Sequence, residues 1–246
     1  MKQFKLLTAV ALVIITVSCK KNADPAPPPA PTPGSSTVPK VKTKEYGNSA
    51  FNYEYDNSGR VTREISNTGF KTEYTYGNNT VTEDGYDANG VLINKRQVTL
   101  DASGLAIAIT DNSNPALTQD LAYNNEGHLT KRIVKQNGIE ISVYYYIYSN
   151  GNLVMDSIAE AGGDWSTAKY EYYPDIISTI ERDNFGVGYY GKGNKNAVKK
   201  VIEQFDVNTM EISEFGIPEF DASGRIIKRT QTVNGGPVFV LTYLYY

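Results

Sequence analysis

Residues 53–63 read YEYDNSGRVTR, and the same pattern returns at 121–131 (LAYNNEGHLTK) and at 218–228 (PEFDASGRIIK). In each copy an Asp or Asn begins a four-residue turn that ends in Gly, and apolar and polar residues alternate on both sides. The Asp or Asn side chain bonds to the backbone two residues on, and Gly supplies the positive φ of a type I turn with a G1 bulge. Each copy therefore predicts a β-hairpin.

The turn glycines recur at positions 59, 90, 104, 127, 151 and 224, several of them close to 24 residues or a multiple of it apart. A period of about 24 residues fits two strands of about eight residues with their turns. Sequential hairpins predict an all-β antiparallel meander. We expect about 13 to 15 strands over residues 45–246, curling into an open or closed barrel-like sheet.

The N-terminal segment, residues 1–18, reads as a signal peptide, with two lysines ahead of an apolar run that is too short to span a bilayer. Its last three residues and the following cysteine read Thr16-Val17-Ser18-Cys19, which resembles a bacterial lipobox. We expect lipidation of Cys19, the only cysteine, and anchoring to the outer membrane, facing periplasm or cell surface. The alternative is an ordinary secretory signal with a cysteine nearby by chance. Residues 19–44 carry seven of the eleven prolines and predict an extended linker.

Charge and composition exclude several function classes. Residues 45–246 hold 17 Lys plus Arg against 26 Asp plus Glu, a balance that argues against a nucleic-acid partner. With one Cys and one His, neither a thiolate metal site nor a His-based triad is expected. The sequence singles out no catalytic residue, cofactor or metal, so we expect a protein that is not an enzyme.

The combination of an SCKKN lipobox, a Pro-rich tether and repeated YxYDxxGRVT hairpins resembles a large group of Bacteroides-type lipoproteins of unknown function with a porin-like fold. The resemblance implies the fold and the compartment, and no activity. The aromatic C-terminus, residues 238–246, raises the alternative of a membrane-spanning barrel. Strict alternation in 61–65 places Arg63 on the apolar face with Val61, which disfavours that alternative.

Several positions are candidates for ligand contact or modification. The GxGxxG in residues 185–191 lacks a βαβ context and predicts a flexible loop, while 196–205 fits a short helix or a strand. His128 follows a turn glycine and is expected to be exposed. Ser157 lies in a short O-glycosylation signal. The candidate ligand contacts are loop aromatics and two lysines of the one basic cluster: Trp165, Tyr189, Tyr190, Lys192 and Lys195.

These observations favour a lipid-anchored, non-catalytic binding module of the cell envelope, with a glycan or another envelope protein as partner. A structural or adhesive envelope component is the alternative. A hydrolase that uses a carboxylate pair is a third hypothesis, although no spacing singles out two of the 26 acids.

Overall fold

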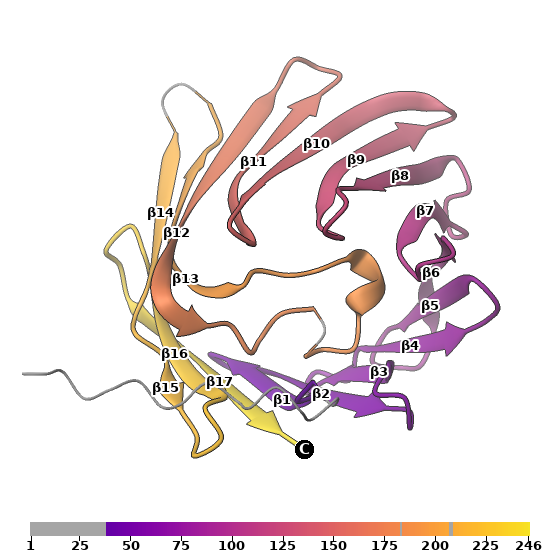
Figure 1. Cartoon of the computed structure of the whole chain (residues 1–246). Coiled ribbons are helices and arrows are strands. Elements are labelled where there is room, and N and C mark those ends of the chain that lie inside the picture. The colour runs from indigo at the N-terminus through magenta and orange to yellow at the C-terminus, as the bar shows by residue number, and fades with distance from the viewer. Residues whose placement is uncertain (1–37, 183, 207–208) are drawn as a thin grey trace, which may run out of the picture.

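The computed structural model describes residues 38–182, 184–206 and 209–246, which form one antiparallel sheet closed into a barrel (Figure 1). Strand β1 pairs with both β2 and β17, and this pairing closes the ring. Strands β14 and β15 both pair with β16 and share one position, so the seventeen strands make a sixteen-strand wall. The strands are β1 (Val41–Tyr46), β2 (Ser49–Tyr55), β3 (Val61–Ser66), β4 (Lys71–Tyr76), β5 (Thr80–Tyr86), β6 (Leu92–Leu100), β7 (Ala106–Asp111), β8 (Leu117–Tyr123), β9 (Leu129–Gln136), β10 (Ile139–Ser149), β11 (Asn152–Glu160), β12 (Trp165–Ile177), β13 (Asn196–Gln204), β14 (Met210–Phe215), β15 (Glu219–Phe220), β16 (Ile226–Val233) and β17 (Val238–Tyr245).

The predicted all-β antiparallel barrel is confirmed. The number of strands is larger than the expected 13 to 15, because several strands are only six residues long. Strand β1 begins at Val41, ahead of the expected start of the domain at residue 45. Residues 196–205, for which helix and strand were both open, form strand β13 up to Gln204.

The repeated turns have the predicted chemistry. Asp56 Oδ1 accepts hydrogen bonds from the backbone N–H groups of Ser58 and Arg60 at 2.9 and 3.0 Å, and Gly59 has φ +74°. The turns that begin at Asp87, Asp101, Asn124 and Asp221 repeat both of these backbone bonds. Local side-chain bonding therefore explains why these segments reverse the chain.

A bulge directly follows each of these turns. Tyr55 pairs with Val61 but Glu54 pairs with Arg63, so one extra residue enters β3. The same shift follows the glycines at 90, 104, 127, 151 and 224. A bulge breaks the strict alternation of faces. The prediction that Arg63 shares the face of Val61 is therefore wrong: Val61 is buried, and Arg63 pairs with Glu54 at 3.2 Å on the outer wall.

A barrel of sixteen strands encloses more space than its own side chains can fill. Here the chain between β12 and β13 turns back into the interior (Figure 1). We call residues 178–182 and 184–195 the plug; it contains a single 3₁₀ turn, η1 (Gly188–Tyr190). The plug meets the barrel at the end that carries the turns after β2, β8 and β15, which we call the plugged end. The opposite end is the open end.

Backbone hydrogen bonds join the plug to the wall. Asn184 O accepts from the N–H of Val41 at 2.9 Å, and Gly186 O accepts from the N–H of Val61 at 3.4 Å. The N–H groups of Lys192 and Lys195 donate to two turn carbonyls, each at 2.9 Å. Because these bonds reach strands on several sides of the ring, the plug is integrated with the barrel.

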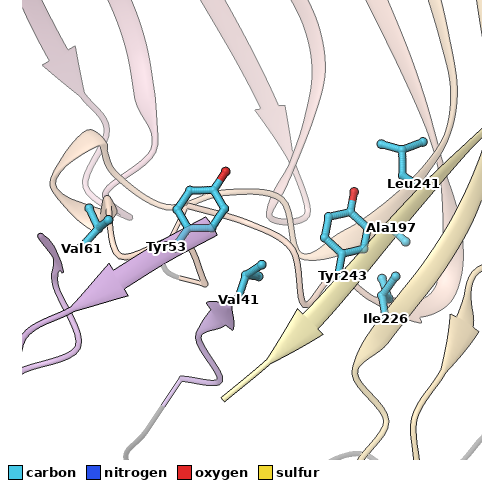
Figure 2. Packing of buried hydrophobic residues seen from close by; sticks show 7 residues of the cluster. All are labelled: Val41, Tyr53, Val61, Ala197, Ile226, Leu241 and Tyr243. Atoms are coloured by element: carbon cyan, nitrogen blue, oxygen red, sulfur yellow. The ribbon is translucent and has the colours of Figure 1, made fainter. Parts of the chain in front are cut away.

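Two apolar clusters lie between the plug and the wall. Figure 2 shows the first, in which Val41, Tyr53 and Tyr243 from three adjacent strands converge. Phe185 of the plug packs against it, and Val187 packs against both clusters. The buried members of the second cluster are Val81, Val98, Ala106, Ile109, Leu121, Leu129 and Tyr189. The hydrophobic core of the barrel thus depends on the plug.

The outer wall carries ion pairs in cross-strand rows. Lys71 and Arg63 both contact Glu73, at 2.9 and 3.2 Å, and Lys135 contacts Asp120 at 2.5 Å. Within the described residues, no helix has the length and apolar character needed to cross a bilayer.

Candidate functional site: the barrel lumen

A cavity of about 610 Å³ lies in the lumen directly above the plug. Its volume is in the range of small-molecule sites. The plug forms the floor, and the wall comes mainly from β1 to β10. The polar and aromatic side chains that line the cavity are Lys44, Tyr53, Glu64, Tyr74, Glu83, Arg96, Gln119, Arg132, Tyr146, Glu181, Arg182, Phe185, Tyr189 and Tyr190.

Glu83 holds the floor of the cavity in place. Its side chain is almost fully buried, and Oε1 accepts hydrogen bonds from the hydroxyls of Tyr189 at 2.7 Å and Tyr190 at 2.8 Å. Arg96 Nη1 lies 3.7 Å from Glu83 Oε2. Burial, and then the Glu83 carboxylate, raise the pKa of both tyrosines well above its ordinary value. Both hydroxyls therefore remain protonated donors, and the two rings form a fixed surface.

Tyrosine side chains also dominate the wall of the cavity. Burial raises the pKa values of Tyr53, Tyr74 and Tyr146, so each presents a neutral hydroxyl next to an apolar ring. Such side chains combine an aromatic face with a hydrogen-bonding group. The wall is suited to a ligand that has both apolar faces and many hydroxyls.

One pair of opposite charges faces the lumen from β1 and β3. Burial lowers the pKa of the Lys44 ammonium, and the Glu64 carboxylate works in the opposite direction. Burial raises the pKa of Glu64, and Lys44 partly counteracts it. The two groups are thus coupled and partly desolvated.

Arg132 of β9 differs from the charged residues around it. Its guanidinium lies over the ring of Tyr144, 3.8 Å from the centroid. Among the described residues no carboxylate lies within 4.0 Å of it, and its Nε is buried without a hydrogen-bond partner. Arg132 also lines the cavity, so the lumen holds an arginine that has no carboxylate partner among the described residues.

The predicted contact residues do not form one site. Tyr189 and Tyr190 reach the cavity, where they are buried and hydrogen-bonded rather than exposed on a flexible loop. Lys192 and Lys195 line a second cleft of about 890 Å³ at the plugged end. Trp165 begins β12 at the open end, with 40% of its surface exposed.

The two predicted modification sites lie elsewhere. Ser157 is in the middle of β11, paired in register with Tyr145 and Thr167. Cys19 lies outside the described residues.

His128 is buried, so the prediction of an exposed turn position is wrong. Its ring stacks on Tyr148 with centroids 4.4 Å apart, and its Nδ1 lies 3.4 Å from the carbonyl oxygen of Lys192. The plug covers this turn, and a local turn pattern carries no information about a segment that arrives 64 residues later.

Sequence reasoning missed most of the cavity wall. Glu83 shares a strand face with Val81, and Arg96 shares one with Val98. A charged residue on an otherwise apolar strand face was therefore the sequence signal that could have identified these two residues. No such signal existed for Glu64 and Arg132, because a bulge precedes each of them.

The lumen supplies groups for recognition: aromatic faces, hydroxyls, an amide and fixed charges. In the described part of the chain, no group of three or more His, Cys, Asp or Glu side chains is placed to hold a metal ion.

Comparison with known proteins supports the fold. No protein-family model and no curated protein matches the chain. Among solved structures, a porin-like protein from Bacteroides uniformis ATCC 8492 is similar, with a TM-score of 0.61 and 17% sequence identity over 84% of this chain and 98% of that chain. At this level of identity the similarity extends to the fold: the chain has the porin-like β-barrel architecture of that protein.

Proposed function

We propose that the protein is a non-catalytic binding module that holds a saccharide-sized polar ligand in the lumen above the plug. The observation that carries this proposal is the cavity of about 610 Å³, lined by tyrosine rings and by polar groups such as Gln119 and Glu64. Stacking against rings and hydrogen bonding to hydroxyls are the two interactions that a sugar offers. Because the plug blocks one end of the barrel, the lumen is suited to binding rather than to free passage.

Tyr145 and Tyr146 provide a matched pair of variants. Tyr146 lines the cavity, whereas Tyr145, next to it on β10, is 46% exposed on the outer wall. A panel of neutral and charged mono-, di- and trisaccharides, screened by ligand-observed NMR against the full-length protein, should yield binders. We expect Tyr146→Ala to weaken them by about tenfold or more, and Tyr145→Ala to leave them unchanged. Absence of any Tyr146-dependent binder would refute the proposal.

We also propose that Cys19 is lipidated and anchors the protein to the outer membrane. Support comes from where the tether enters the barrel: Asn184 Nδ2 of the plug donates to Pro39 O at 2.9 Å, so the chain arrives at the plugged end. Metabolic labelling with a fatty-acid analogue tests the anchor, because a Cys19→Ala variant should lose the label.

A second candidate function, an adhesive or structural envelope component, is favoured by one observation. Apolar side chains gather at the open-end tips of several hairpins, where turns normally carry polar residues. Those with more than 40% of their surface exposed are Phe70, Val91, Leu92, Ile93, Ile139, Phe205, Met210 and Val238. Recovery of one envelope protein by cross-linking in cells, lost when Phe70 and Leu92 are both changed to Ser, would support this function.

A further inference from the structure

An arginine without a counter-ion stands out in this lumen. Two cations of the outer wall each have a carboxylate partner: Lys95 lies 3.5 Å from Asp84, and Lys135 lies 2.5 Å from Asp120. Arg132 has no such partner among the residues that the structure describes, although it is partly buried. Removing a cation from water without a compensating anion is unfavourable. An anionic ligand would supply what the protein itself does not.

The surroundings of Arg132 form a subsite. Gln119 and Tyr146 line the same cavity, and Tyr144 stacks under the guanidinium and fixes its plane. Stacking on an aromatic ring leaves the edge of a guanidinium free to donate hydrogen bonds.

A second unpaired cation lies on the plug side of the subsite. Arg182 donates to the carbonyl of Tyr190 and, within the described residues, has no carboxylate within 4.0 Å. Both guanidinium charges act on the hydroxyl of Tyr146 and lower its pKa, against the raising effect of burial. Both arginines therefore lie near the hydroxyl of Tyr146 in the cavity.

Three acids that face the lumen already accept hydrogen bonds from other side chains. Glu83 accepts the two plug tyrosines, and Asp156, opposite Tyr146 in register, accepts the hydroxyl of Tyr170 at 2.7 Å. Glu181 accepts a hydrogen bond from Ser178 at 2.8 Å. None of these carboxylates forms an ion pair with Arg132. They therefore do not neutralise the positive charge that Arg132 brings to the cavity.

We infer that the lumen site selects an anionic saccharide, a sugar that carries a carboxylate or a sulfate, and that Arg132 is the residue that recognises the anion. This inference rests on the proposed function and names the ligand class of the same site. A guanidinium binds either group through two parallel N–H donors, whereas the tyrosine rings pack against the sugar.

The test compares ligands that differ only in charge. Binding of trigalacturonate, of its methyl ester and of N-acetylglucosamine 6-sulfate to the full-length protein is measured by isothermal titration calorimetry. We expect trigalacturonate to bind about tenfold or more tighter than its neutral ester, with a preference that weakens as salt is added. Strong binding of the sulfate instead would identify a sulfated sugar as the source of the anion.

Two substitutions at adjacent positions distinguish the loss of a positive charge inside the lumen from the loss of one on the outer wall. Arg132→Gln and Lys131→Gln remove the same charge, but Lys131 lies over Tyr145 on the outer wall. Arg132→Gln should abolish the preference, so that the charged ligand and its ester bind with similar affinity, whereas Lys131→Gln should leave the preference as it is in the unmodified protein. Arg132→Lys, which keeps the charge but loses the two-pronged geometry, should retain a part of the preference.

The outcomes separate this inference from the function on which it rests. Equal affinity for ester and charged ligands overturns the inference and leaves the proposed function standing. A charge preference that survives in Arg132→Gln overturns the role of Arg132. Failure of every saccharide to bind overturns both. Where a variant does not fold, the comparison of charged and ester ligands on the unmodified protein still tests whether the site prefers an anion.

Discussion

Two glycines with nearly the same positive φ differ in what surrounds them. At Gly186 (φ +72°) an added Cβ would lie 2.6 Å from the backbone N of Val61, whereas at Gly224 (φ +75°) it would meet nothing within 4 Å. We expect Gly224→Ala to lower the free energy of unfolding by about 1 kcal/mol, and Gly186→Ala by about 3 kcal/mol. Urea denaturation measures both, and equal losses would show that the plug does not approach β3 as described.

Glu83 is the residue on which the floor of the cavity depends. Replacing it with Ala leaves the buried hydroxyls of Tyr189 and Tyr190 without an acceptor. We expect Glu83→Ala to lower the free energy of unfolding by about 3 kcal/mol. The control, Glu54→Ala, removes an exposed ion pair with Arg63 and should change it by less than about 0.5 kcal/mol. Comparable effects of the two substitutions in urea denaturation would contradict this role.

The carboxyl of Glu181 makes stability depend on pH. Burial raises its pKa above the ordinary value of 4.5, so the folded state holds the proton to higher pH than the unfolded state does. The contribution of Glu181 to the free energy of unfolding is therefore fully present below pH 4.5. It is lost as the pH rises through the raised pKa, by at most about 1.4 kcal/mol per pH unit. Glu181→Gln should be more stable than the native protein at pH 7.5 and equally stable at pH 4. A less stable variant at pH 7.5 would contradict the assignment.

At the scale of elements, the hairpins were predictable and the plug was not. The turn at Asp56 is determined by bonds between residues two and four apart, which a sequence pattern records. Residues 185–191 are buried because a closed ring of strands is wide enough to enclose them. That width depends on the number of strands in the whole chain, so no local sequence pattern predicts it. For the same reason the sequence suggested Tyr189 and Tyr190 as exposed contacts. Arg132 remained undetected because the bulge after Gly127 reverses the faces of β9.

The plug should open only together with the barrel, because its residues belong to both apolar clusters. Native-state hydrogen exchange tests this expectation at two amides. The N–H groups of Lys192 and Lys195 donate to the carbonyls of Gly127 and Gly151, each at 2.9 Å. Their free energies of opening should lie within about 1 kcal/mol of that of a core strand amide such as Val98. Fast exchange at both amides with slow exchange at Val98 would show instead that the plug moves independently.

At the scale of the whole molecule, the two faces of the wall have distinct compositions. The outer face carries the ion pairs of Lys71, Lys95 and Lys135, whereas the lumen carries the tyrosines and Arg132, which has no ion pair among the described residues. A lipid-facing wall would require the reverse, since each cation at the bilayer midplane costs about 2–4 kcal/mol. The distribution fits a barrel that stands in water and offers its interior to a ligand.

This distribution predicts the behaviour of the chain without its anchor. Residues 20–246, produced without the signal peptide and Cys19, should be monodisperse in detergent-free buffer, because the paired charges of the outer wall remain hydrated. Size-exclusion chromatography with light scattering measures the dispersity, and calorimetry measures Tm with and without a mild detergent. We expect detergent to leave Tm unchanged. Aggregation in buffer together with a higher Tm in detergent would mean that the outer wall contacts lipid, and the assignment of the lumen as the face exposed to aqueous ligands would then require revision.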